Sequence, residues 1–198
     1  ARLCTAETTA AHVRENHAAF IARGARLSTE VHQLPLEAVH EALKIARAAG
    51  LATTVDLDQA PSEAVPALGD AKTLDAVLRM ADLLKPSKRG ARELLGARAD
   101  TDALSLAKRL RQRFGNQAVV VTDGEAGCAI ASDAFEGAVA APRVRAIDAT
   151  GAGDAFLGAL HAGLHQGLSL RDAARLGNAA GAACVERMGA FPADLAWA

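Results

Sequence analysis

Aromatic residues are scarce in this sequence: they make up 3% of the 198 residues, tyrosine is absent, and the single tryptophan is Trp197. Stacking platforms for nucleic-acid bases therefore have little to be built from, and aliphatic side chains must form the core. The charge is balanced, with 22 Lys and Arg residues against 23 Asp and Glu residues. This balance, without any block of basic residues, argues against partners such as nucleic acid or an anionic membrane surface.

Cysteine is also rare, and long apolar runs are missing. The three cysteines, Cys4, Cys128 and Cys184, are too few and too widely spaced for a disulfide framework or a paired-cysteine metal site. This usage is typical of a reducing compartment, so we expect a cytoplasmic protein. The longest apolar stretch, residues 155–164, is far shorter than a membrane span. The chain begins at Ala1, which leaves open whether it is a fragment of a longer protein.

Segments with helical periodicity alternate with short aliphatic runs. The expected helices are 35–50, 72–80, 91–95, 102–114, 152–166 and 169–187, and the expected strands or extended segments are 52–57, 82–85, 118–122, 127–131 and 139–144. We expect a loop at 86–90 and make no firm assignment before residue 35. The alternation predicts an α/β fold in which helices sandwich a mostly parallel sheet, with ligands at the carboxyl ends of the strands. Without a linker or repeat, residues 1–198 are expected to form a single domain.

The strongest local signal is a glycine-rich turn, Gly151-Ala152-Gly153, that joins a strand end to an amphipathic helix. Glycine lets the backbone approach a ligand, and the N-terminus of a helix favours an anion such as phosphate. Asp154 follows in the first helical turn, where a carboxylate can accept the proton of an attacking hydroxyl. The plain alternative is an ordinary turn with an aspartate that complements the helix dipole. A dinucleotide site is disfavoured because Phe156 stands where a third glycine is required, and the sequence has no P-loop.

Residues 148–156, with the sequence DATGAGDAF, match the signature near the carboxyl end of the ribokinase-like (PfkB) carbohydrate kinases, and the chain resembles that family. The likeness extends to residues 122–127, which are similar to the family's T-x-G-x-x-G nucleotide loop. Residues 178–180 and 189–190 resemble its last helix and the following turn. The resemblance covers about residues 20–192, most of the chain.

The resemblance implies transfer of the γ-phosphoryl group of ATP to a hydroxyl of a sugar or sugar-like molecule. Asp154 would be the base, and the backbone of Gly151, Ala152 and Gly153 would form the anion hole. The implied cofactors are ATP, Mg²⁺ and, in many members, K⁺. The implied nucleotide contacts are Ser87, Thr122, Gly124, Gly127, Gly153 and Asn178. The implied monovalent-cation site comprises Asp148, Thr150, Cys184, Arg187 and Gly189, the last three through backbone oxygens, and Ala193 stands where some members offer a hydroxyl.

Two features depart from the family pattern. The N-x-x-E motif that organises Mg²⁺ should fall at residues 87–90, which are here Ser-Lys-Arg-Gly. Glu93 is a candidate substitute, while Lys88 and Arg89 either contact phosphate or face solvent. The family's N-terminal strands, with the sugar-binding segment and the lid that often forms a homodimer, have no counterpart here. The alternative function is therefore a truncated, non-catalytic nucleotide-binding remnant, and a weaker third possibility is an α/β interaction domain without a ligand.

Two histidines and two aspartates are further candidates for a functional role. His161 and His165 have metal-ligand spacing on a helix, but no third ligand is near in the sequence, so we expect a surface or packing role. Asp56 and Asp58 follow a predicted strand and could line the ligand edge of the sheet or simply cap a loop. Fructose, ribose, a ketodeoxy acid and a nucleoside all stay open as acceptors, because the residues that distinguish them lie in the family's N-terminal segment.

Overall fold

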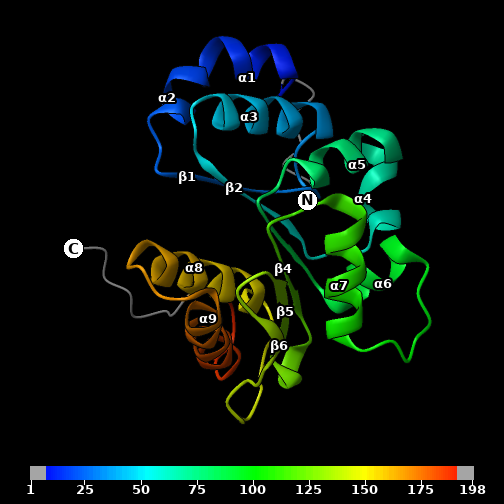
Figure 1. The fold of residues 1–198 in the computed structure, drawn as a ribbon, viewed down its shortest axis with the longest axis vertical. Coiled ribbons are helices and arrows are strands. Elements are labelled where there is room, and N and C mark those ends of the chain that lie inside the picture. Colours follow the sequence, from blue (N-terminus) through cyan, green and yellow to red (C-terminus); the bar gives the residue numbers. More distant parts are fainter. Residues whose placement is uncertain (1–7, 191–198) are drawn as a thin grey trace.

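A six-stranded sheet forms the centre of the structure (Figure 1). The computed structural model describes residues 8–190, apart from the side chains of residues 63–66, so Cys4, Ala193 and Trp197 lie outside the described residues. The strands are β1 Arg26–Glu30, β2 Ala52–Leu57, β3 Leu83–Pro86, β4 Ala118–Thr122, β5 Cys128–Ser132 and β6 Glu136–Val139. They lie in chain order, β1 to β4 parallel and β5 and β6 antiparallel, which confirms the predicted α/β fold with a mostly parallel sheet.

Helices cover both faces of this sheet (Figure 1). Those in the described part are α1 Ala10–Asn16, α2 Ala18–Ala22, α3 Leu36–Ala48, α4 Pro61–Leu68, α5 Ala71–Arg79, α6 Lys88–Leu95, α7 Ala103–Phe114, α8 Ala152–His165 and α9 Leu170–Val185, with a 3-10 turn, η1, at Gly124–Ala126. No helix among residues 8–190 is both long enough and apolar enough to cross a membrane.

Local sequence explains where several helices begin and end. Asp70, Asp102 and Ser169 accept hydrogen bonds from backbone N–H groups at the starts of α5, α7 and α9. Gly96 and Gly115 end α6 and α7 with φ angles of 55° and 75°, in the left-handed region that glycine favours. The predicted helices and strands are therefore largely confirmed.

Two aliphatic clusters form the core, one on each side of the sheet. The larger packs α3, α5 and α7 against β2 to β4 and contains fully buried residues such as Leu43, Leu78 and Leu110. The smaller packs Phe156 of α8 and residues of α9 against β4 and β5. The two C-terminal helices lie close together because Gly177 of α9 has no side chain. A Cβ there would stand only 2.9 Å from the Phe156 ring. This packing holds the start of α8 in place relative to the sheet.

Some local predictions are wrong. The loop expected at 86–90 is a strand end followed by helix α6, because the Ser87 hydroxyl accepts a hydrogen bond from Gly90 N at 3.1 Å and starts the helix. Residues 140–144 are not a strand, since β6 ends at Val139, and α9 ends at Val185. Helix α4 and the elements before residue 35 were not assigned from sequence. Short segments of this kind depend on neighbours for their stability rather than on their own periodicity.

Candidate functional site

The carboxyl ends of the parallel strands meet at one edge of the sheet, and loops from three of them are linked there. Ser87, just after β3, forms a bridge with Thr122 at the end of β4. The Ser87 hydroxyl also donates to the Asp58 carbonyl oxygen, after β2, at 2.6 Å. A Cβ on Gly153 of α8 would stand 3.4 Å from Asp58 Oδ1. The structure therefore brings Ser87, Thr122 and the glycine turn of α8 to the same edge.

The first turn of α8 offers free backbone donors. Gly151 precedes the helix with φ of 80°, and a Cβ there would stand 2.7 Å from Ala190 Cβ, so the turn requires glycine. The Ala152 N–H donates to Ala149 O at 3.2 Å, so this amide, expected in the anion hole, is already used. The described residues offer no acceptor to the N–H groups of Gly153 and Asp154. These two amides, next to the exposed Asp154 carboxylate, can receive an anion.

A buried ion pair lies next to this turn. Lys85 Nζ donates to both carboxylate oxygens of Asp56, at 3.0 and 2.9 Å, and would lie 3.3 Å from a Cβ on Gly153. Burial raises the pKa of Asp56 to about 6, and the attraction of the Lys85 ammonium limits that rise. From the sequence, Asp56 has two possible roles and Lys85 has none assigned. The available signal was a lysine inside a short run that otherwise has the pattern of a buried strand.

The predicted nucleotide loop forms a tight turn after β4. Gly127 has φ of 92°, and a Cβ there would overlap the carbonyl oxygen of Val139, so this position also requires glycine. Gly124, with φ of 54°, is exposed and has open space where a Cβ would stand. The carboxylate of Asp123 accepts a hydrogen bond from Lys88 Nζ at 2.7 Å. This ion pair ties the nucleotide loop to the start of α6.

Asn178 is a buried residue of α9, with 5% of its surface exposed. Its side-chain amide donates to Val139 O at 2.8 Å and to Ala140 O at 3.3 Å. It contacts Cys128, whose pKa burial raises to about 12. Asn178 thus holds the end of β6 against α9, close to Gly127, and its amide donors are used internally.

The residues implied for a monovalent cation converge before α8. Asp148 accepts hydrogen bonds from Thr150 N and Oγ1, at 2.9 and 2.7 Å, and from Gly189 N at 2.8 Å. These bonds hold the pKa of Asp148 below its ordinary value, so it stays ionised at neutral pH. Cys184 Sγ donates to Thr150 O at 3.5 Å, and Arg187 N donates to Cys184 O at 3.4 Å. The ionised Asp148 carboxylate thus contacts N–H and O–H donors of Thr150 and Gly189, and carboxylate and carbonyl oxygens are the ligand types that a hard cation prefers.

The expected magnesium motif has no acidic residue. Lys88 is engaged with Asp123, and a Cβ on Gly90 would stand 2.9 Å from a backbone oxygen. Glu93, the candidate substitute, accepts hydrogen bonds from Ser62 N and Oγ at 2.6 and 3.0 Å, which ties it to α4. The carboxylate that does approach the glycine turn is that of Asp58, 56% exposed. Mg²⁺ often uses only one or two carboxylates together with substrate phosphates, so Asp58 fits such an ion.

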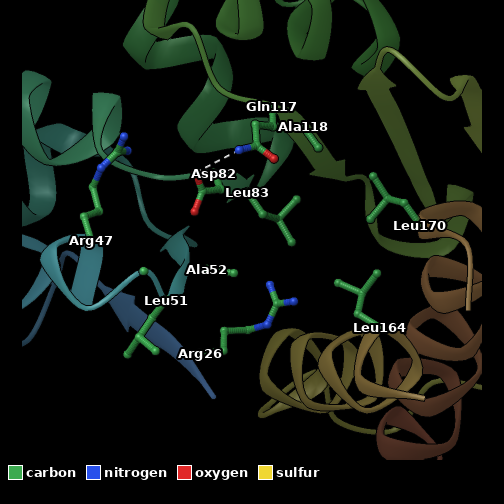
Figure 2. A pocket seen from close by; sticks show the side chains of 11 residues that line it. Arg26, Arg47, Leu51, Ala52, Asp82, Leu83, Gln117, Ala118, Leu164 and Leu170 are labelled. Atoms are coloured by element: carbon green, nitrogen blue, oxygen red, sulfur yellow. Dashed lines mark hydrogen bonds between the residues drawn. The ribbon is translucent and has the colours of Figure 1, made fainter. Parts of the chain in front are cut away.

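A separate pocket lies at the opposite, amino end of the strands. Figure 2 shows its lining side chains, with Arg26, Ala52, Leu83 and Ala118 at the starts of β1 to β4 and Leu164 at the end of α8. Its volume is about 520 Å³. Because the glycine turn of α8 lies at the carboxyl ends of the strands, this pocket belongs to neither the predicted nucleotide site nor the anion site.

His161, one of the two histidines with metal-ligand spacing, contacts β1. His161 Nε2 lies 3.2 Å from Ser28 Oγ, and burial lowers the pKa of His161 to about 4, with the charge of Arg26 adding to the effect. Among residues 8–62 and 67–190, no three His, Cys, Asp or Glu side chains are grouped so as to hold a metal ion. The packing role expected for His161 agrees with these contacts.

Comparisons with known proteins agree with this fold. Fructokinase-2 of Oryza sativa subsp. japonica is 41% identical over 86 residues, covering 40% of this chain and 26% of that protein. A ribokinase of Staphylococcus aureus (strain COL) is 31% identical over 161 residues, covering 80% of this chain and 49% of that protein. The crystal structure of a ribokinase from Thermotoga maritima superposes with a TM-score of 0.73 at 22% identity, covering 93% of this chain and 57% of that one.

The matches therefore span about half of these relatives' length or less. The family model described as "pfkB family carbohydrate kinase" matches residues 5–195, nearly the whole sequence. The fold, with its glycine turn at the carboxyl edge of the sheet, agrees with this match. The chain therefore belongs to the pfkB family of carbohydrate kinases.

Proposed function

We propose that this chain binds ATP and supplies the phosphoryl-transfer half of a carbohydrate kinase, with a hydroxyl of a sugar or sugar-like molecule as acceptor. The observation that carries the proposal is the first turn of α8. There, two backbone N–H groups without an acceptor in the described chain adjoin an exposed carboxylate, that of Asp154. Donors of this kind stabilise the charge that develops on a transferring phosphoryl group, each contributing roughly 3–4 kcal/mol.

Asp154 would act as the general base. Its carboxylate would accept the proton of the acceptor hydroxyl as that oxygen attacks the γ-phosphorus, while the bond to the ADP oxygen breaks. The amides of Gly153 and Asp154 would hold the equatorial phosphoryl oxygens. Thr122, Gly124 and Gly127 would contact the nucleotide, while Asn178 would act through the position of β6, because its own donors are occupied.

Two cations fit the residues present. Asp58, near Gly153, would hold Mg²⁺ together with the ATP phosphates, and the ion would neutralise phosphate charge. Asp148, with the backbone of Thr150, Cys184, Arg187 and Gly189, would hold K⁺ close to the start of α8. Such a kinase works on soluble metabolites where ATP is abundant and thiols are reduced, which favours the cytoplasm.

The second candidate, a nucleotide-binding remnant without catalysis, is favoured by one observation. Neither the Asn nor the Glu of the expected magnesium motif is present at residues 87–90. The remnant would bind ATP but produce no ADP in response to any acceptor, whereas a kinase would do both.

The test combines binding and turnover. Calorimetric titration with ATP and Mg²⁺ measures binding, and coupled ADP production is followed with fructose, ribose and myo-inositol as acceptors. Asp154→Asn should abolish acceptor-dependent ADP production while ATP binding persists. Asp172→Asn is the matched control, because Asp172 also lies in the first turn of a helix, α9, away from the sheet edge. Equal turnover in the Asp154 variant would refute the proposed base, and no heat with ATP would refute both candidates.

A further inference from the structure

A fully buried ammonium group lies next to the first turn of α8. Lys85 is the third residue of β3, and its side chain is 0% exposed. In the register of the sheet it stands beside Asp56 of β2, and Nζ donates to both oxygens of that carboxylate. An ammonium has three N–H donors, and the side chains and backbone that the structure describes provide no further acceptor within hydrogen-bond distance for the third. The carboxylate of Asp58 stands at 3.9 Å.

The ion pair is oriented with its positive end toward the turn. At the position of a Cβ on Gly153, the nearest atom is Lys85 Nζ at 3.3 Å, followed by Oδ1 and Cγ of Asp58. No atom of Asp56 is among these three nearest atoms. An anion bound at the amides of Gly153 and Asp154 would therefore lie closer to the ammonium than to the carboxylate that neutralises it.

Stability alone gives little reason for such a pair. Removing an ammonium and a carboxylate from water carries a desolvation penalty that their attraction often only offsets, and apolar residues of similar size are frequently as stable. The positions that flank the pair along β2 and β3 are aliphatic and fully buried, namely Val55, Leu57 and Leu84, while the partly buried Glu30 of β1 stands in register beside Asp56. The charges are therefore the unusual feature of this part of the sheet, and they lie at the end where the proposed anion site is.

We propose that Lys85, held in place by Asp56, is a positioning residue for the terminal phosphoryl group of ATP. This inference rests on the proposed function, because it requires nucleotide phosphates at the first turn of α8. The ammonium favours a nucleotide with a γ-phosphate over one without it, and it offsets the repulsion that the Asp58 carboxylate exerts on that phosphate. Its effect decreases with distance, so it is larger for the γ-phosphate than for the rest of the nucleotide.

The ratio of ATP affinity to ADP affinity is the measurement that isolates this role. Both dissociation constants are determined by calorimetry with the 198-residue chain at the same Mg²⁺ concentration. In the double variant Lys85→Met/Asp56→Asn, which leaves no unpaired buried charge, the ratio is expected to fall about tenfold or more, the scale of a charge-assisted contact. A general loosening of the fold would instead weaken both nucleotides equally.

Two further variants keep the test decisive. Lys85→Gln retains a donor for Asp56 but removes the positive charge, so its ratio should also fall, and it serves if the double variant does not fold. Asp82→Asn is the structural control: its carboxylate accepts bonds from Thr53 N and Oγ1 at 2.8 and 2.9 Å, at the amino end of the same strands. This control is expected to lower the melting temperature without changing the ratio.

The outcomes separate the two proposals. A reduced ratio in a folded Lys85 variant, with an unchanged ratio in Asp82→Asn, supports the inference. An unchanged ratio in a folded Lys85 variant overturns it and leaves ATP binding by the parent chain standing. If the parent chain binds neither nucleotide, the proposed function fails and this inference fails with it.

Discussion

Asp58 Oδ1 lies 3.4 Å from the point where a side chain on Gly153 would begin, although one residue follows β2 and the other lies in α8. A carboxylate this close to two amides without acceptors would repel a phosphate unless a cation lay between them. The closeness of Asp58 to Gly153 therefore links the proposed phosphoryl site to the proposed magnesium site.

Replacement of Asp58 should change the Mg²⁺ dependence of ATP binding. In Asp58→Asn, ATP affinity measured with Mg²⁺ is expected to fall about tenfold, because a carboxylate ligand is lost. With EDTA present, the same variant should bind ATP at least as well as the parent, because a repelling charge is removed. Asp133→Asn, at a carboxylate that is 94% exposed in the turn between β5 and β6, is the control. Identical Mg²⁺ dependence of Asp58→Asn and the parent would contradict the assignment.

Gly153 should matter for binding rather than for folding. In Gly153→Ala the new methyl group would stand 3.3 Å from Lys85 Nζ and 3.4 Å from Asp58 Oδ1, so the turn must shift. We expect the affinity for ATP to fall by up to about tenfold, while the melting temperature stays close to that of the parent. Gly158→Ala lies in the exposed middle of α8, where the new Cβ would meet no atom beyond its own stretch of helix within 4 Å, and should leave binding unchanged and add about 0.5–1 kcal/mol of stability. If Gly153→Ala and Gly158→Ala changed ATP affinity equally, the special role of Gly153 would be contradicted.

Gly127 should be required for stability. Its φ of 92° is unfavourable for alanine, and the methyl group would overlap the Val139 carbonyl oxygen. Gly127→Ala is expected to lower the free energy of unfolding by about 3 kcal/mol or more, measured by urea denaturation. Gly124→Ala also has a positive φ but open space around it, so about 1 kcal/mol is expected there. A loss for Gly127→Ala no larger than that for Gly124→Ala would rule out the steric explanation.

Glu41 should make stability depend on pH in the acid range. Its carboxylate accepts hydrogen bonds from Arg14 Nε at 2.8 Å and Lys44 Nζ at 3.0 Å, and these bonds lower its pKa from 4.5 to about 2. A depressed pKa in the folded state stabilises the protein above the unfolded-state value, and this contribution is lost as pH falls toward about 2.

Denaturation of the parent and of Glu41→Gln over this pH range measures that contribution. The difference in unfolding free energy between them should be largest above pH 4.5 and should disappear near pH 2. Glu37→Gln, at an exposed position in the first turn of the same helix, is the control. A pH-independent difference between the parent and Glu41→Gln would mean that Arg14 does not hold α1 to α3 through this carboxylate.

Local patterns in the sequence determined most of the helices and strands and the position of the glycine turn. Helix caps such as Asp102 and stops such as Gly115 act within a few residues, so their effect can be predicted without a partner. The turn before α8 and the aspartate after it were also predicted, because they belong to one contiguous segment. Ser87 was interpreted as part of a loop, although it caps a helix, because the composition of a loop and of a strand-to-helix junction is the same.

Only the tertiary structure decided which side chains surround that turn. Lys85 meets Asp56 because β2 and β3 are adjacent in register, and Asp58 meets Gly153 because α8 packs across the sheet edge. The side-chain amide of Asn178, a residue expected near the nucleotide, donates to the end of β6. These contacts join residues that are far apart in the chain, and the energies of buried charges and amides depend on those neighbours. A sequence pattern gives the order of the residues but not their tertiary neighbours. Those neighbours decide whether a side chain is buried, which partner it pairs with and whether it is ionised.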